Sequence, residues 1–152
     1  MKIKKNSIDK LEVLIVSGNT IECPIIHRFT PGMYIREMFA PAGTLLTSKI
    51  HLTEHPFIVS KGKLSVWNDI GKEEKIEAPY CGITKKGTRR VMLIHEDTVW
   101  TTFHATDKLT PEEVEAEIIQ PHINTITGTN INEDYKNNLI TKKEEILCHL
   151  YQ

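Results

Sequence analysis

Short runs of hydrophobic, β-branched and aromatic residues recur from residue 11 to about residue 105, separated by breaks that contain glycine, proline or asparagine. The clearest runs are "LEVLIV", "MYIREMF", "HPFIVS", "RRVMLIH" and "TVWTTFH". The breaks return about every 8 to 12 positions, which is typical of an all-β sandwich or barrel and not of alternating strands and helices. The pattern therefore predicts a jelly-roll β-sandwich as the fold class, over residues 1–106.

Helical signals come only after this region. Thr110-Pro111-Glu112-Glu113 forms a capping box with proline at the first helical position, and Thr141 with Glu144 forms a second box. Narrow apolar stripes follow both boxes. We predict short helices near 111–119 and 142–150, within a C-terminal helical extension that covers residues 107–152.

Composition and charge limit the classes of partner. The 152 residues carry a formal net charge of −1, so no overall field attracts a nucleic acid polymer or a membrane surface. No apolar run approaches the roughly 18 residues of a membrane span, and no apolar stretch follows the basic N-terminus as in a signal peptide. Cys23, Cys81 and Cys148 are few and far apart, which indicates reduced thiols and a cytoplasmic location.

The segment "GTLLTSKIHLTEHPFIVSKG", residues 43–62, places two closely spaced histidines between glycines. It resembles the first motif of the cupin superfamily, in which two histidines one residue apart precede an acidic ligand. In this resemblance His51 matches the second histidine, Lys49 stands at the first, and His55 stands at the acidic position. Two of the three ligand positions in this motif have therefore changed.

Later phrases extend the resemblance. "KKGTRR" matches the glycine of the second cupin motif with Gly87, but Arg90 stands where a histidine is expected. "KIHLTEH", "GTRRV" and "HEDTVWTTFH" are similar to cupin-like proteins of bacteriophages. The resemblance implies a small jelly-roll barrel with a ligand pocket between its sheets, usually oligomeric. We expect a homodimer or homotetramer, because exposed sheet edges need covering and the C-terminal helices suit contacts between subunits.

Cations at metal-ligand positions favour an anion site. Side chains alternate along a strand, so Lys49 and His51 are expected to point into the barrel, and Arg90 to lie with Met92. Arginine offers a planar donor fork to phosphate or carboxylate, and lysine adds a point charge. The residues expected to bind the ligand are Lys49, His51, His55, Lys86, Arg89, Arg90, Trp100 and His104.

The expected ligand is an anionic small molecule derived from a nucleotide. By analogy with phage proteins that sequester immune signals, the first hypothesis is a non-enzymatic sponge for a cyclic dinucleotide of the bacterial anti-phage defence CBASS, with no cofactor. A second hypothesis is a metal-dependent cupin enzyme, a dioxygenase or an isomerase. It would rebuild a metal site from His51 and His55 with either His95 or His104. A third is a structural, virion-associated jelly roll in which the polar stretch only shapes a turn.

Overall fold

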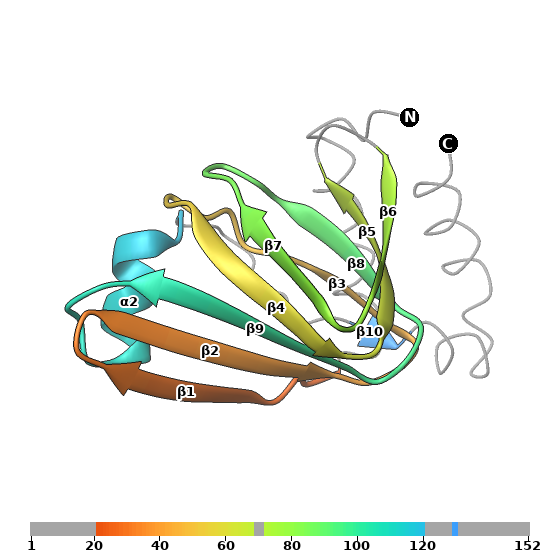
Figure 1. The fold of residues 1–152 in the computed structure, drawn as a ribbon, viewed down its shortest axis with the longest axis horizontal. Coiled ribbons are helices and arrows are strands. Elements are labelled where there is room, and N and C mark those ends of the chain that lie inside the picture. The colour runs from red at the N-terminus through yellow and green to blue at the C-terminus, as the bar shows by residue number, and fades with distance from the viewer. Residues whose placement is uncertain (1–20, 69–71, 121–128, 131–152) are drawn as a thin grey trace.

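The computed structural model describes residues 21–68, 72–120 and 129–130, which form two antiparallel sheets of five strands (Figure 1). The first sheet has the order β1 (Ile25–Thr30), β2 (Met33–Ala40), β9 (Thr98–Ala105), β4 (His55–Lys61) and β7 (Tyr80–Thr84). The second has the order β10 (Thr129–Asn130), β3 (Thr44–Thr47), β8 (Arg90–Ile94), β5 (Lys63–Asn68) and β6 (Glu73–Glu77). The predicted all-β jelly-roll class is confirmed.

The hydrophobic core lies between the two sheets. Alternate residues of each strand point inward, as the pleat requires, and meet the inward residues of the other sheet. The buried core residues are Cys23, Met38, Ala40, Leu46, Phe57, Val59, Leu64, Val66, Ile76, Met92, Ile94 and Trp100. Phe57 and Trp100 stack with ring centroids 4.3 Å apart and an interplanar angle of 8°.

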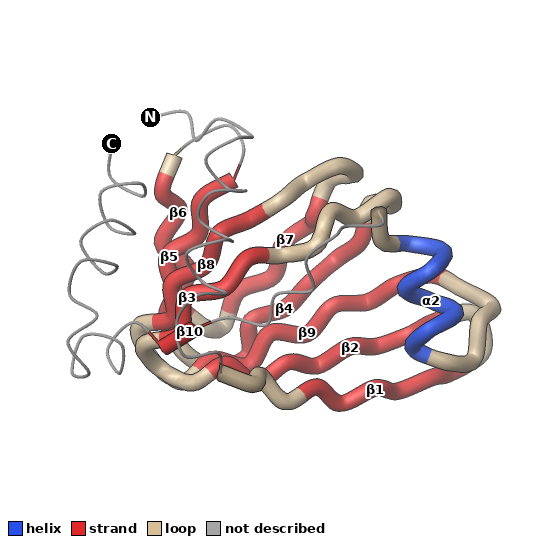
Figure 2. Tube along the Cα trace, turned by 180° about the vertical axis from the view of Figure 1, so that it is seen from behind, coloured by secondary structure: helices blue, strands red, loops and turns tan. Residues whose placement is uncertain are grey.

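The helix predicted near 111–119 is confirmed as α2 (Pro111–Ile118). The side chain of Thr110 accepts a hydrogen bond from the backbone N–H of Glu113, as the capping box predicts. Val114 and Ile118 are buried against Tyr34, and α2 thereby covers one end of the sandwich beside β1, β2 and β9 (Figure 2). The predicted helix at 142–150 and the strand expected from "LEVLIV" lie outside the described residues.

One strand is shorter than the sequence predicts, and another is absent from the prediction. The sequence predicts a strand that continues through Lys49 and His51, but β3 ends at Thr47 and the chain then forms a loop that leads to β4. Within this loop His51 makes a single antiparallel bridge to Ile119, next to the end of α2. The other difference is β6, which the hydrophobic pattern missed because four of its five residues are charged and only Ile76 is buried.

Gly82 in β7 leaves room for an aromatic ring. A Cβ added at this position would lie 2.6 Å from Cζ of Phe57, whose ring is held against Trp100. Gly82→Ala is therefore expected to lower the free energy of unfolding by about 1–3 kcal/mol, the usual cost of overpacking a core. Urea denaturation measures this change. The matched control is Cys81→Ala, since Cys81 is exposed on the outer side of the same strand; an equal loss in both variants would contradict the argument.

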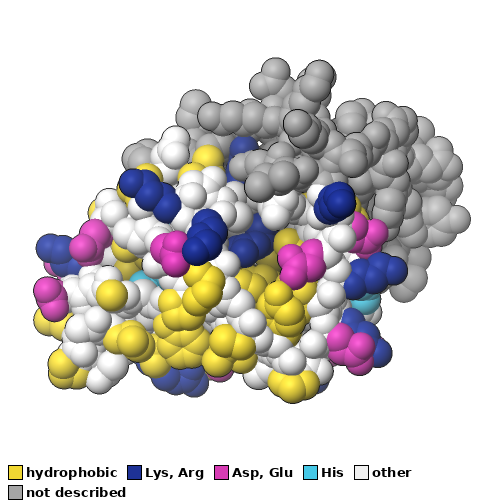
Figure 3. Space-filling view, turned by 45° about the horizontal axis from the view of Figure 1, so that its top comes forward, with side chains coloured by type: hydrophobic (Ala, Val, Ile, Leu, Met, Phe, Trp, Pro, Cys, Tyr) yellow, Lys and Arg dark blue, Asp and Glu magenta, His cyan; other side chains and the backbone are white. Residues whose placement is uncertain are grey.

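The outer face of the first sheet exposes hydrophobic side chains. Ile58 of β4 is 37% exposed and Ile83 of β7 is 52% exposed, and yellow side chains gather in the lower middle of the view in Figure 3. Scattered apolar residues are common on protein surfaces, so these exposed side chains alone do not indicate a binding site. No helix among the described residues is long and apolar enough to cross a membrane.

Candidate functional site

A cavity of about 220 Å³ lies between the sheets, at the end of the sandwich that α2 covers. Its walls come from inward residues of β2, β9, β4 and β8, from the loop after β3, and from Glu115, Ile118 and Ile119 of and beside α2. The helix predicted as part of a separate extension thus contributes to the wall of the barrel's cavity.

Three histidines converge in this cavity. His51 comes from the loop after β3, His55 begins β4 and His104 lies near the end of β9. Their potential ligand atoms all lie within 4.8 Å of one another. The ring centroids of His55 are 4.4 Å from His51 and 4.3 Å from His104. These residues span 54 positions of the sequence: the antiparallel pairing of β4 with β9 brings His55 and His104 together, and the bridge to Ile119 places His51 beside them.

Burial keeps the imidazoles neutral. It is the largest cause of a pKa of about 3 for both His51 and His104, and it also lowers the pKa of His55. Repulsion adds to this effect: Arg36 lowers the pKa of His51 and His104, and Arg90 lowers that of His51 and His55. At neutral pH each ring therefore has one nitrogen lone pair available as a hydrogen-bond acceptor or metal ligand.

Two ring nitrogens in the cluster have no partner among the described residues. Nδ1 of His51 and Nδ1 of His104 are buried and form no hydrogen bond. Nε2 of His104 lies 2.9 Å from the hydroxyl of Thr102, and Nδ1 of His55 lies 3.3 Å from the carbonyl oxygen of Thr53. A buried polar atom without a partner is costly, so these nitrogens indicate a site for something that the cavity binds.

Arg36 is a cationic residue of the cavity that was not among the residues predicted from the sequence. It is partly buried on the inward face of β2, and desolvation is the largest cause of its lowered pKa. Within the described part of the chain its guanidinium forms no hydrogen bond or ion pair. The strand pattern of "MYIREMF" contains the signal, because alternation puts Arg36 between inward-facing Tyr34 and Met38.

Arg90 enters from the opposite sheet. Its Nη1 donates a 2.7 Å hydrogen bond to the hydroxyl of Thr84, and its guanidinium carbon lies 5.1 Å from the ring centroid of Phe57 and 5.8 Å from that of Trp100. These contacts hold the guanidinium of Arg90 in place, and its other N–H groups can donate hydrogen bonds to a ligand. Arg90 therefore lies in the cavity, as alternation along β8 predicts.

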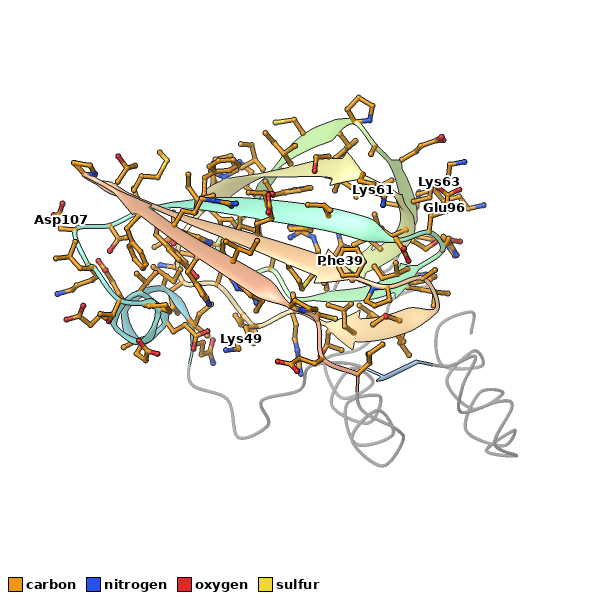
Figure 4. All side chains as sticks on the ribbon, turned by 90° about the horizontal axis from the view of Figure 1, so that it is seen from below. Phe39, Lys49, Lys61, Lys63, Glu96 and Asp107 are labelled. Atoms are coloured by element: carbon orange, nitrogen blue, oxygen red, sulfur yellow. The ribbon has the colours of Figure 1, made fainter. Side chains whose placement is uncertain are left out.

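Lys49 lies at the rim and is already paired. Its Nζ is 3.0 Å from a carboxylate oxygen of Glu115, and 39% of its side chain is exposed. Figure 4 shows Lys49 beside α2, while Lys63 and Glu96 lie together at the opposite end of the barrel. The alternation argument for Lys49 fails because β3 ends at Thr47, two residues earlier.

The remaining predicted residues divide into two groups. His51, His55, Arg90, Trp100 and His104 line the cavity together with Lys49. Arg89, Lys86 and His95 do not line it. Arg89 is buried just before the start of β8, and Lys86 is exposed in the turn between β7 and β8. Nε2 of His95 lies 2.8 Å from the hydroxyl of Ser65 on β5. Of the two alternatives for the third histidine, the geometry favours His104 over His95.

No family model and no curated protein matches the sequence. Solved structures match the fold. Salicylate 1,2-dioxygenase from Pseudoaminobacter salicylatoxidans is 12% identical with a TM-score of 0.53, over 77% of this chain and 36% of that one. A double-stranded β-helix protein from Klebsiella pneumoniae is 14% identical with a TM-score of 0.51, over 66% and 90%. Ectoine synthase from P. lautus is 14% identical with a TM-score of 0.50, over 70% and 83%. At these identities the matches show the fold alone, and that fold is a double-stranded β-helix.

Proposed function

We propose that the protein binds a small anionic molecule in the cavity between its sheets, without transforming it. The observation that carries the proposal is Arg36, a partly buried guanidinium without a hydrogen-bonding partner among the described residues, in the same cavity as Arg90. The carboxylate of Glu115 attracts this guanidinium, but it is ion-paired with Lys49 and forms no ion pair with Arg36. Burial of a cation without a contacting counter-charge is unfavourable, and a bound anion reduces that cost.

The surroundings support an anion held by both sheets. Arg36 is attached to the first sheet and Arg90 to the second, and both lower the pKa of His51. The histidine cluster therefore lies in the field of both guanidinium groups. A carboxylate or phosphate in this space accepts charge-assisted hydrogen bonds, and a neutral imidazole N–H can add another.

The cavity volume restricts the size of the ligand. About 220 Å³ is below the roughly 300–1,000 Å³ of pockets that enclose drug-sized molecules. A whole cyclic dinucleotide exceeds this space, so the proposal is limited to a smaller anion. Sequestration of an immune signal, a phage origin, a cytoplasmic location and a dimer or tetramer remain predictions from the sequence.

Calorimetric titration of the metal-free protein tests the proposal. Acetate and inorganic phosphate are titrated in the presence of a chelator, and acetamide serves as the neutral counterpart of acetate. We expect acetate or phosphate to bind with about one site per chain and acetamide not to bind. Equal binding of acetate and acetamide, or binding of neither anion, would refute an arginine-based anion site.

A second candidate function, a metal-dependent enzyme, is favoured by the histidine cluster. Three neutral imidazoles with ligand atoms within 4.8 Å of one another match the donor set of a mononuclear metal site, and two of them have an unsatisfied nitrogen. A divalent ion held by His51, His55 and His104 would supply a Lewis acid. The role of Arg36 and Arg90 is then to orient an anionic substrate, with their positive charge opposing the binding of the ion itself.

Removing His104 tests the metal candidate directly. If the cluster binds metal, Zn²⁺ added to the chelator-treated protein gives one site per chain, and His104→Ala weakens it by about tenfold or more, because a three-ligand site loses one donor. His95→Ala is the matched control, since His95 lies outside the cavity. Calorimetry with Zn²⁺ and elemental analysis of the purified protein measure both quantities. Equal Zn²⁺ affinity in the wild type and in His104→Ala would exclude this cluster as the metal site.

A further inference from the structure

The inward residues of the first sheet change from polar to apolar along the strands. Backbone register sets three rows across β2 and β9: Tyr34 with His104, Arg36 with Thr102, and Met38 with Trp100. The first row lies against α2, because Tyr34 packs on Val114 and Ile118. On this sheet the cavity wall is therefore polar at the α2 end and becomes apolar two rows away.

The second sheet shows the same change in the same direction. Arg90 is the first residue of β8, and Met92 follows it on the inward face. Leu46 of β3 is the register partner of Met92. The hydroxyl of Thr84, which pairs in register with His55, binds Arg90, so Arg90 lies at the histidine end. Both walls thus present guanidinium groups first and then methionine, leucine and tryptophan side chains.

Successive inward rows are about 6.6 Å apart, twice the rise per residue of a strand. A ligand that reaches from the arginine row to the next row therefore extends by the length of a short alkyl chain or one ring. Met38, Leu46, Met92 and Trp100 line the cavity there and are each less than 8% exposed. A sugar or another polyhydroxylated group in that space would lose its hydrogen bonds to water without gaining partners.

We infer that the ligand is a small organic acid with one carboxylate and an apolar chain or ring. The carboxylate lies between Arg36 and Arg90 beside the histidines, and the apolar part lies over Met38, Met92 and Trp100. This inference rests on the proposed function, since it specifies the chemistry of the anion that the same cavity binds. An organic acid of this kind differs from a free phosphate, which has no apolar part, and from a nucleotide, which carries a polar sugar next to its phosphate.

A homologous series of acids tests the inference on the wild-type protein. Acetate, butanoate, hexanoate and benzoate are titrated calorimetrically with chelator present, alongside inorganic phosphate, butanamide and benzamide. Each buried methylene is expected to tighten binding about fourfold, until the chain fills the apolar row. Benzoate is expected to bind at least tenfold more tightly than acetate, and the amides are expected to bind much more weakly than their acids.

The titrations distinguish a failure of the organic-acid inference from a failure of the proposed anion-binding function. If acetate and phosphate bind but chain length brings no gain, the organic-acid inference is wrong and the anion-binding function stands. If no anion binds, or if amides bind as well as acids, both the function and the inference fail. An affinity that rises with chain length for acids alone supports both.

A variant locates the apolar part. Met92→Gln keeps the approximate volume of the side chain and adds a polar amide, so it should remove most of the gain in affinity from acetate to hexanoate. Met38→Gln makes the same test on the other sheet. An unchanged chain-length gain in both variants would place the apolar part elsewhere and overturn the inference. Because the wild-type series needs no variant, the inference stays testable even where a glutamine disturbs folding.

Discussion

Replacing Arg36 with methionine is expected to weaken binding of a small anion about tenfold to a hundredfold and to make the ligand-free protein more stable. Charge-assisted hydrogen bonds contribute about 1.5–3 kcal/mol each, and 1.4 kcal/mol corresponds to a tenfold change in affinity. The stability gain, about 1 kcal/mol, follows because the partly buried guanidinium has no hydrogen-bonding partner among the described residues. Calorimetry and urea denaturation measure the two effects.

The controls separate this effect from a general change in charge. Lys86→Ala removes a cation outside the cavity and is expected to leave both affinity and stability nearly unchanged. Arg90→Ala should weaken binding by a similar tenfold to hundredfold, but without a gain in stability, because it also removes the hydrogen bond to Thr84 and the contact with Phe57. Arg90→Lys should recover part of the affinity without the bidentate geometry. A destabilised Arg36→Met protein with full affinity would contradict the role given to Arg36.

Acidification is expected to destabilise the metal-free protein below about pH 6.5. His51 and His104 have a pKa of about 3 in the folded protein, against an ordinary value of 6.5. Between these values the unfolded chain binds protons that the folded cavity excludes, so the free energy of unfolding falls as the pH falls. Each of the two histidines contributes about 1.4 kcal/mol per pH unit, or about 2 kcal/mol at pH 5. Above pH 7 neither contributes, because both states are neutral.

Urea denaturation at pH 8, 6 and 5 with a chelator present measures this dependence. His104→Phe keeps a ring against Tyr34 and removes one titrating group, so its stability should fall less steeply with acidification than that of the wild type. The surface variant Lys86→Ala should keep the wild-type slope. A slope that is unchanged by His104→Phe would mean that this imidazole is solvated in the folded protein.

The fold could be predicted from the sequence because its signals are local. Strand alternation and the breaks between strands specify an all-β chain, and the Thr110–Glu113 capping box marks the start of α2. The charged strand β6 could not be found this way, since it contributes one buried residue and lies at the edge of its sheet. Such a strand is identified only by its hydrogen-bonded partner, β5.

The candidate site could be predicted only where regular alternation continues. Arg90 and Trp100 lie inside strands, so their inward direction follows from the pleat. Lys49 and His51 lie beyond the end of β3, where alternation no longer applies: His51 reaches the cavity through its bridge to Ile119, and Lys49 turns to Glu115. Choosing His104 over His95 required the pairing between β4 and β9, which spacing in the sequence does not reveal.

The bridge between His51 and Ile119 makes the histidine cluster a joint product of two segments far apart in the chain. Backbone hydrogen bonds from Leu52 to the carbonyl of Ile118 and from Gln120 to the carbonyl of Ile50 tie the same two segments together. A chain shortened to residues 1–106 would therefore retain β1 to β9 but lose β10, α2 and the backbone contacts that place the His51 ring. The strands and α2 are therefore interdependent, because the position of a site residue in the barrel depends on backbone contacts made by the helix end.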